Sequence, residues 1–227
     1  MDVVPPCPDE AEALHPALDR IPPGRHAIVV DNGSADGSAD IASDPGAYVV
    51  REPWRGFGSG RHPGPSPATA AVVRCCDGDA SLELAVLPRA GYPVLGGSDD
   101  LVQGHRRPTA RRARPSHART ANLELARLIR RRTCLSLREL GPVQAARHEA
   151  VPALNLTDRH HPLHTVVRAA YAGLRGCETD VPYRPRTGRR SSVTGTRYMW
   201  QAVRDTRAVL TERPATGSAA AMSGAVA

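Results

Sequence analysis

The stretch Ala70-Ala71-Val72-Val73-Arg74-Cys75-Cys76-Asp77-Gly78-Asp79 decides the fold of this chain of 227 residues. Its first seven residues form a mainly apolar run, which is typical of a parallel strand that is covered on both faces. Two acidic side chains follow the run directly. Because ligands of open α/β sheets lie outside the carboxyl ends of such strands, we predict a ligand site at Asp77 and Asp79.

The triplet Asp77-Gly78-Asp79 has the chemistry of a divalent-cation site. Two carboxylates separated by one flexible glycine can both face a hard cation and leave coordination positions for phosphate oxygens. All-oxygen sites of this kind suit Mg²⁺ or Mn²⁺. Taken alone, an acid-Gly-acid triplet is more often an ordinary turn, because Asp and Gly are common turn formers. The metal prediction therefore depends on the rest of the chain.

A second apolar run ends in a polar turn further upstream. Residues 27–30 predict another buried strand, and Asp31-Asn32-Gly33-Ser34-Ala35-Asp36-Gly37-Ser38 follows it. Acidic and amide side chains in such a turn can bind a ribose or a base edge, and glycines let the backbone approach a ligand. We expect a helix over residues 38–43, capped by Asp36 or Ser38. The alternative is a turn with a helix cap and no ligand.

Six motifs in this order resemble those of the family 2 glycosyltransferases, nearest to the branch of dolichyl-phosphate and polyprenyl-phosphate sugar transferases. They are Val3–Glu10, Val29–Ser38, Arg55–Gly58, Asp77–Asp79, Gly104–Arg107, and the late basic loop of Tyr183–Arg186 with Ser191. The resemblance implies one α/β domain over residues 1–212, of the Rossmann-like nucleotide-diphospho-sugar transferase (GT-A) type. Its mostly parallel sheet would be flanked by helices, and residues 213–227 would form a disordered tail.

The same resemblance implies an enzyme that moves a sugar from a nucleotide-diphospho-sugar, a UDP- or GDP-sugar, to an acceptor with inversion. Asp77 and Asp79 would bind Mg²⁺ or Mn²⁺, and Asp79 would also be catalytic. Arginines would add forked donors to the diphosphate. The donor-binding residues that the resemblance implies are Pro6, Cys7, Glu10, Asp31, Asn32, Ser34, Asp36, Gly56, Asp77, Gly78, Arg106, Arg186 and Arg190.

The acceptor implied by the resemblance is polyprenyl phosphate first and a hydroxyl acceptor second. A lipid phosphate is already an anion and needs no base, whereas a hydroxyl needs a carboxylate within hydrogen-bond reach. Glu139 and Asp158 lie where the family has acidic residues near the acceptor, so they are the candidate catalytic carboxylates. Each of them fits a structural carboxylate facing solvent equally well.

Two departures from the family pattern support an alternative, a weakened paralogue that binds nucleotide sugar without turnover. His160-His161-Pro162-Leu163-His164 replaces an aromatic and acidic pattern, and Ser192 replaces a lysine. A proline interrupts the histidines and no further ligand follows at zinc spacing. We interpret this stretch as the entry to a helix with imidazoles on the surface.

The charge of the chain leaves a third alternative, a basic nucleic-acid-binding module. The formal net charge is +7, and all 30 basic residues are arginine. Phe, Trp and Tyr make up only 4% of the residues, which leaves few platforms for stacking on bases. Helix-turn-helix and zinc-knuckle spacings are also missing, so the sequence disfavours nucleic acid as a partner.

The composition indicates a cytoplasmic enzyme. The sequence has neither a recognisable secretory signal nor a run of about 18 apolar residues that would span a membrane. Arginines at 106–119 and at 130–132 could approach an anionic bilayer. A lipid acceptor would therefore be reached by peripheral binding at the inner face of the plasma membrane.

Alternating strand and helix signals predict repeated β-then-α units and hence a mostly parallel sheet. After an opening strand, the expected strands are 27–30, 47–50, 71–76 and 100–103, and residues 181–183 lead into the late basic loop. The expected helices are 10–18, 38–43, 118–131, 162–172 and 197–212. In the helix over 118–131, the expected buried face is formed by Ala121, Leu125, Leu128 and Ile129.

Overall fold

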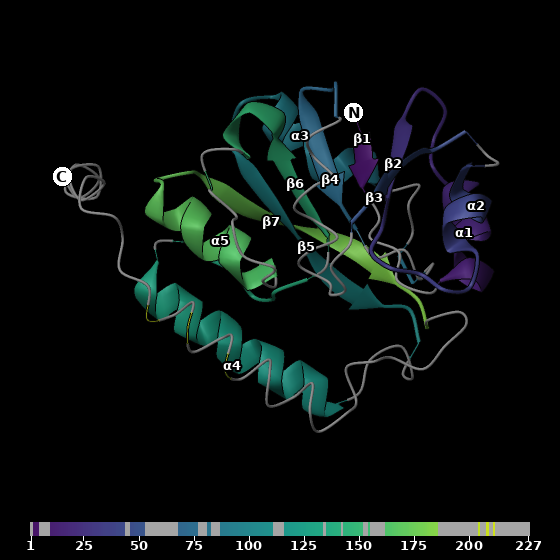
Figure 1. Cartoon of the computed structure of the whole chain (residues 1–227). Helices are drawn as coiled ribbons and strands as arrows, with labels where there is room; N and C mark the ends of the chain where they lie inside the picture. Colours follow the sequence, from purple (N-terminus) through teal and green to yellow (C-terminus); the bar gives the residue numbers. More distant parts are fainter. Residues whose placement is uncertain are drawn as a thin grey trace.

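The computed structural model describes residues 2–4, 10–43, 46–52, 68–76, 81–82, 87–110, 116–133, 135–141, 143–151, 154, 162–185, 204, 208 and 211. These residues form a seven-stranded sheet with helices on both of its faces (Figure 1). The strands are β1 (Asp2–Val4), β2 (His26–Asp31), β3 (Tyr48–Arg51), β4 (Val72–Cys75), β5 (Leu101–Pro108), β6 (Gln144–Arg147) and β7 (Gly176–Tyr183). The helices are α1 (Ala11–Leu18), α2 (Ser38–Ser43), α3 (Leu87–Leu95), α4 (Ser116–Arg132) and α5 (Pro162–Tyr171), with a 3₁₀ turn at His148–Ala150.

The sheet has the strand order β3-β2-β1-β4-β6-β5-β7 and is mostly parallel. Strand β6 is antiparallel to both of its neighbours, β4 and β5, and every other neighbouring pair is parallel. The predicted α/β class and the mostly parallel sheet are therefore confirmed. Because all strands except β6 run the same way, their carboxyl ends meet along one edge of the sheet.

The register across the sheet aligns two of the predicted motifs. One row of paired residues runs through Ala27, Val3, Arg74, Ala145 and Val102. Asp31 lies four residues beyond Ala27 on β2, and Arg106 lies four residues beyond Val102 on β5. These two residues, 75 positions apart in the sequence, are therefore at the same level along the strands.

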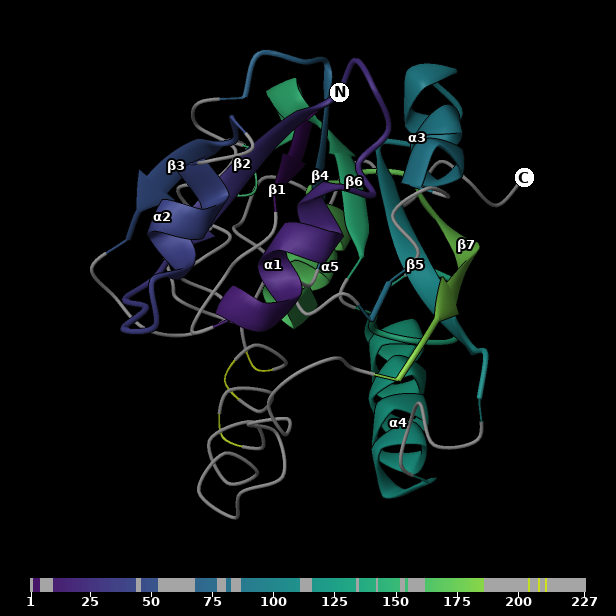
Figure 2. The same ribbon diagram turned by 90° about the vertical axis from the view of Figure 1, so that its right-hand side faces the viewer.

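Two layers of helices enclose the sheet. Val102 faces α3, where it is buried with Val94, whereas the preceding residue Leu101 is buried with Ile129 of α4 and Leu163 of α5. Successive strand residues point to opposite faces, so α3 lies on one face and α4 and α5 on the other. Helices α1 and α2 share the face of α3, and Figure 2 shows α1 and α5 on opposite sides of the sheet.

The structure corrects several predicted elements. Strand β5 extends to Pro108, because its second half pairs with β7 up to the register Pro108↔Tyr183. Helix α3 and strands β6 and β7 were not expected. Of the helix 197–212, the described residues 204, 208 and 211 are helical. The domain limits, 1–212 with a tail at 213–227, stay a prediction.

The buried face of α4 also differs from the prediction. Ala126 and Ile129 are fully buried, and Leu125 is partly buried against them. Ala121 and Leu128 are exposed, the latter at 42%, so the predicted face was displaced around the helix. In α5, His164 is 3% exposed, which contradicts its interpretation as a surface imidazole. Among the described helices, none has the length and apolar character that a bilayer crossing requires.

Candidate functional site

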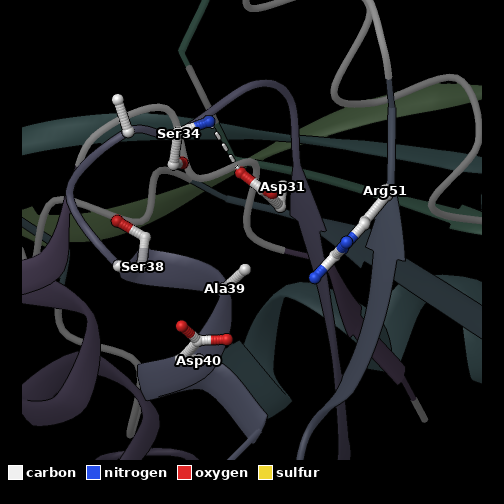
Figure 3. Close-up of a pocket in the computed structure, with 8 residues that line it drawn as sticks. Asp31, Ser34, Ser38, Ala39, Asp40 and Arg51 are labelled. Carbon is white, nitrogen blue, oxygen red and sulfur yellow. Dashed lines mark hydrogen bonds between the residues drawn. The ribbon is translucent and has the colours of Figure 1, made fainter.

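The turn after β2 forms a cavity of about 310 Å³ at the carboxyl edge of the sheet. The backbone N–H of Ser34 donates to the carboxylate of Asp31 over 2.9 Å, which closes the turn on itself. Figure 3 shows the side chains of Asp31, Ser34, Ser38 and Arg51 around the cavity. Its lining consists of Asp31, Ser34, Ala35, Gly37, Ser38, Ala39, Asp40 and Arg51.

Asp36 and Ser38 tie this turn to the start of α1. The Asp36 carboxylate accepts the backbone N–H of Ala11 over 2.9 Å and that of Ser38 over 3.1 Å, together with the Ser38 hydroxyl. The Ser38 hydroxyl in turn accepts the backbone N–H of Glu10 over 3.1 Å. The predicted residues Glu10, Asp31, Asn32, Ser34 and Asp36 are thus gathered in one region, and Asp36 caps α2 as expected.

These hydrogen bonds set the charge state of Asp36. Burial alone would raise the pKa of this carboxyl group. The bonds from the Ser38 hydroxyl and from the backbone N–H groups of Ala11 and Ser38 outweigh that effect, and the pKa of Asp36 is lowered below its ordinary value of 3.8. Asp36 therefore acts as a fixed anion that joins α1 to the β2–α2 turn.

Arg51 is a lining residue that the sequence analysis missed. It ends β3, and Figure 3 shows its guanidinium extending toward the start of α2. Within the described residues, its side chain forms neither a hydrogen bond nor an ion pair. A basic residue at the carboxyl end of a predicted strand beside an acidic turn was the signal that could have identified it.

A second cavity, of about 360 Å³, lies beside β5. It is bounded by His105 of β5, by the first half of α4, and by the segment before β6. Arginines from two of these elements, Arg119 and Arg138, line it together with the carboxylate of Glu139. The complete lining is His105, Arg119, Thr120, Asn122, Leu123, Arg138 and Glu139.

Glu139 is held by Arg106 on the wall of this second cavity. The Glu139 carboxylate is 3% exposed and accepts the backbone N–H of Arg106 over 3.1 Å and its Nε over 2.5 Å. The Arg106 guanidinium also stacks on Tyr183, with 5.3 Å to the ring centroid. Both oxygens of Glu139 are therefore engaged by one arginine, which is a paired, structural arrangement.

A second carboxylate orients His105 in the same cavity. Asp180 of β7 lies 2.9 Å from Nδ1 of His105 and accepts Nε of Arg107 over 2.8 Å. The hydrogen bond from His105 is the main reason that the pKa of Asp180 is lowered, and the bond from Arg107 adds to it. Nε2 of His105 lies 3.8 Å from Glu139, so the imidazole is placed between two carboxylates.

The predicted metal site lies outside the described residues. This applies to Asp77, Gly78 and Asp79, and also to Pro6, Cys7, Gly56, Asp158, Arg186 and Arg190. Among the residues that are described, His, Cys, Asp and Glu form no group of three that could hold a metal ion. Strand β4 nevertheless ends at Cys75, two residues before Asp77, and runs parallel to β1 and in the same direction as β2.

Comparison with solved structures supports the fold. The chain superposes on the crystal structure of glucosyl-3-phosphoglycerate synthase from Mycobacterium tuberculosis in complex with Mn²⁺ and UDP-glucose, with a TM-score of 0.71 and 20% identity. The match covers 95% of this chain and 80% of that chain. At this level of identity the likeness concerns the fold, and it confirms the GT-A type that the sequence predicted.

Comparison with other sequences finds a relative of higher identity than this crystal structure. An uncharacterized glycosyltransferase of Mycobacterium tuberculosis (strain H37Rv) is 42% identical over 195 residues, which cover 85% of this chain and 89% of the relative. A dolichyl-phosphate hexose transferase of Haloferax volcanii is 26% identical over 173 residues, with 75% of each chain covered. The pattern described as Glycosyl transferase family 2 matches residues 7–148, more than half of the sequence. With these matches and a GT-A sheet, the chain belongs to glycosyl transferase family 2.

Proposed function

We propose that this glycosyltransferase moves a hexose from a UDP- or GDP-sugar to an acceptor that carries a phosphate, polyprenyl phosphate first. The observation that carries the proposal is the pair of cavities beside strands that run the same way, one at the acidic Asp31 turn and one with Arg119 and Arg138. Strands β1, β4 and β6 lie between β2 and β5, so the transfer would take place at the carboxyl edge of the sheet, which these strand ends share.

The first cavity would take the nucleoside of the donor. Asp31 and Ser34 offer oxygens that accept hydrogen bonds from ribose or base, and Arg51 offers donors for a phosphate or a base carbonyl. The crystal structures of glucosyl-3-phosphoglycerate synthase with UDP-glucose support a donor of this class. They leave the choice between UDP and GDP to experiment.

Asp77 and Asp79, which follow β4 in the sequence, would hold Mg²⁺ or Mn²⁺. Carboxylate oxygens suit these ions, and the related fold of glucosyl-3-phosphoglycerate synthase has been crystallised with Mn²⁺. When bound, the ion would stabilise the negative charge of the departing nucleoside diphosphate. Arg186 and Arg190 would add hydrogen bonds to the same oxygens.

The state of Glu139 favours an acceptor that is already an anion. A general base must be able to take a proton, but both oxygens of Glu139 are engaged by Arg106. A phosphate acceptor needs no base, because its oxygen is already an anion. This oxygen attacks the sugar carbon as the bond to the diphosphate oxygen breaks. The electron pair of that bond leaves with the nucleoside diphosphate, and inversion at the carbon follows from this single displacement.

A relative in sequence and a neighbour in structure both support an acceptor that carries a phosphate. The Haloferax volcanii relative is named for dolichyl phosphate, and a neighbouring crystal structure contains phosphoglyceric acid. Arg119 and Arg138, which line the second cavity, would bind the phosphate there, with His105 held beside them by Asp180. A lipid acceptor would bring the enzyme to the inner face of the plasma membrane from the cytoplasm.

Donor binding is the first test of this proposal. Isothermal titration with UDP-glucose and with GDP-mannose, each with Mn²⁺ and with chelator, should show metal-dependent binding of one donor. The Asp79→Ala variant should lose that binding. Transfer of labelled hexose from the bound donor to polyprenyl phosphate and to 3-phosphoglycerate then identifies the acceptor. Failure of a wide panel of nucleotide sugars to bind would overturn the proposal, and binding without transfer to any acceptor would favour the weakened paralogue.

A further inference from the structure

The outer side of α4 combines arginines with exposed leucines. Along its 17 residues the helix carries five arginines and one acidic residue, Glu124. All five arginines are exposed, and Leu123 and Leu128 are 41% and 42% exposed. We call this surface the outer face of α4 and define it by Arg119, Leu123, Glu124, Arg127, Leu128, Arg130 and Arg131, of which Arg127 is paired with Glu124.

The outer face points away from the protein core. Helix α4 is attached through Leu125, Ala126 and Ile129 and through Asn122, whose amide exchanges two hydrogen bonds of 2.8 Å with the backbone of Leu140. These residues repeat at intervals of three and four and therefore form one stripe. Figure 2 shows α4 beyond the end of β5 and β7, away from the bulk of the sheet.

We propose that the outer face of α4 docks on an anionic phospholipid bilayer. Each arginine near such a surface is attracted by the lipid phosphates. Leucines beside the arginines can enter the boundary between headgroups and acyl chains. A nucleic-acid backbone would satisfy the arginines but would offer no apolar layer to Leu123 and Leu128, so the bilayer fits the whole face better.

The position of the face gives docking a consequence for the reaction, and this part rests on the proposed function. Arg119 and Leu123 belong to the outer face and also line the second cavity. A phosphate-bearing lipid in the bilayer would therefore reach Arg138 and His105 past α4 without leaving the membrane. Docking would then deliver the acceptor to the cavity that is proposed to bind its phosphate.

Vesicle co-sedimentation tests the docking surface without donor or acceptor. The wild-type chain should pellet with vesicles that contain phosphatidylglycerol, and about tenfold less with pure phosphatidylcholine or in high salt. The Arg130→Glu/Arg131→Glu variant should lose at least about tenfold in vesicle affinity, since two charges change sign and the net charge of the outer face falls by four units. Neither residue lines either of the two cavities described above, so donor binding should not change.

A matched control makes the same change of charge elsewhere. Arg20→Glu/Arg89→Glu alters two exposed arginines near α1 and α3, on the other face of the sheet, and should keep wild-type vesicle binding. Equal losses in both variants, wild-type binding in both, or no vesicle binding by the wild-type chain would overturn the inference. So would a salt-sensitive shift of duplex DNA that is stronger than vesicle binding. Lost donor binding with intact vesicle binding would instead count against the proposed function alone.

Discussion

Gly141 packs directly on the backbone of Gly104, so closely that a Cβ atom on Gly141 would lie 2.1 Å from the carbonyl oxygen of Gly104. The backbone N–H of Gly104 also donates to the carbonyl of Val143 over 2.9 Å. Two residues before Gly141 lies Glu139, and two residues after Gly104 lies Arg106. The glycine contact therefore sets the distance at which this carboxylate and this guanidinium meet.

Substituting Gly141 by alanine should loosen that contact. A Cβ atom cannot fit against a backbone oxygen at 2.1 Å, so the segment must move away from β5. We expect a loss of about 1–3 kcal/mol in the free energy of unfolding, measured by urea denaturation, and a lower rate of transfer. Ser136→Ala, an exposed change in the same segment, should have neither effect. A fully stable Gly141→Ala would contradict the observed packing.

Glu139→Gln separates a positioning role from that of a general base. The amide keeps the size of the side chain but loses the charge that pairs with Arg106. We expect a higher KM for the acceptor and a fall in kcat of less than about tenfold, with the pH profile of kcat unchanged. A fall in kcat of about 100-fold or more, with loss of a limb of the pH profile, would assign Glu139 as a base instead.

Arg51→Ala should weaken donor binding. The side chain lines the first cavity and, among the described residues, has no competing ion pair. A hydrogen bond to a charged group is worth about 1.5–3 kcal/mol, so the Kd for the nucleotide sugar should rise about tenfold or more. Arg51→Lys should recover part of this loss. Unchanged titration curves would remove Arg51 from the donor site.

Asp36→Asn should make the free energy of unfolding less dependent on pH in the acid range. Because the pKa of Asp36 is lower in the folded chain than its ordinary value of 3.8, its carboxylate contributes stability above that value. This contribution is lost as the pH falls through the lower, folded pKa. Urea denaturation should therefore show that the variant is less stable than the wild type near neutral pH. The difference between their free energies of unfolding should narrow below pH 3.8. A difference independent of pH would contradict this assignment.

Substitutions of Gly91 and Arg74 should have coupled effects on the free energy of unfolding. Arg74 is fully buried on β4, and burial, with the nearby Arg25, lowers the pKa of its guanidinium to about 10. Its Nη2 lies where a side chain on Gly91 would begin, 1.7 Å from a Cβ atom, and it donates to the Pro88 carbonyl over 3.2 Å. Gly91→Ala should cost about 1–3 kcal/mol of unfolding free energy.

Arg74→Met removes both the clash and the buried charge. Replacing a buried charge by an apolar side chain of similar volume is often neutral or stabilising by about 1–4 kcal/mol. The double variant should therefore be more stable than Gly91→Ala alone, in a double-mutant cycle measured by urea denaturation. Purely additive effects would show that the two residues do not share this space.

Helix α3 and strand β6 could not be predicted from local sequence patterns, because tertiary contacts form them. Helix α3 contains Pro88, Gly91 and Pro93, residues that indicate turns, and it forms because Ala90 and Val94 are buried against the sheet while Gly91 admits Arg74. Strand β6 is short and polar, without an apolar period. It forms because it fits between β4 and β5. Neither interaction leaves a local signal in the sequence.

The sequence by itself determined the parallel strands, the order of the motifs and the acidic turn at Asp31. These follow from local apolar runs and turn residues, whose preferences act over a few neighbouring positions. Only the tertiary structure decided that Glu139 engages Arg106, that Arg51 lines the first cavity, and that Leu128 lies outside. Such contacts join residues tens of positions apart, and they depend on sheet register and helix rotation, which packing selects after the local elements have formed.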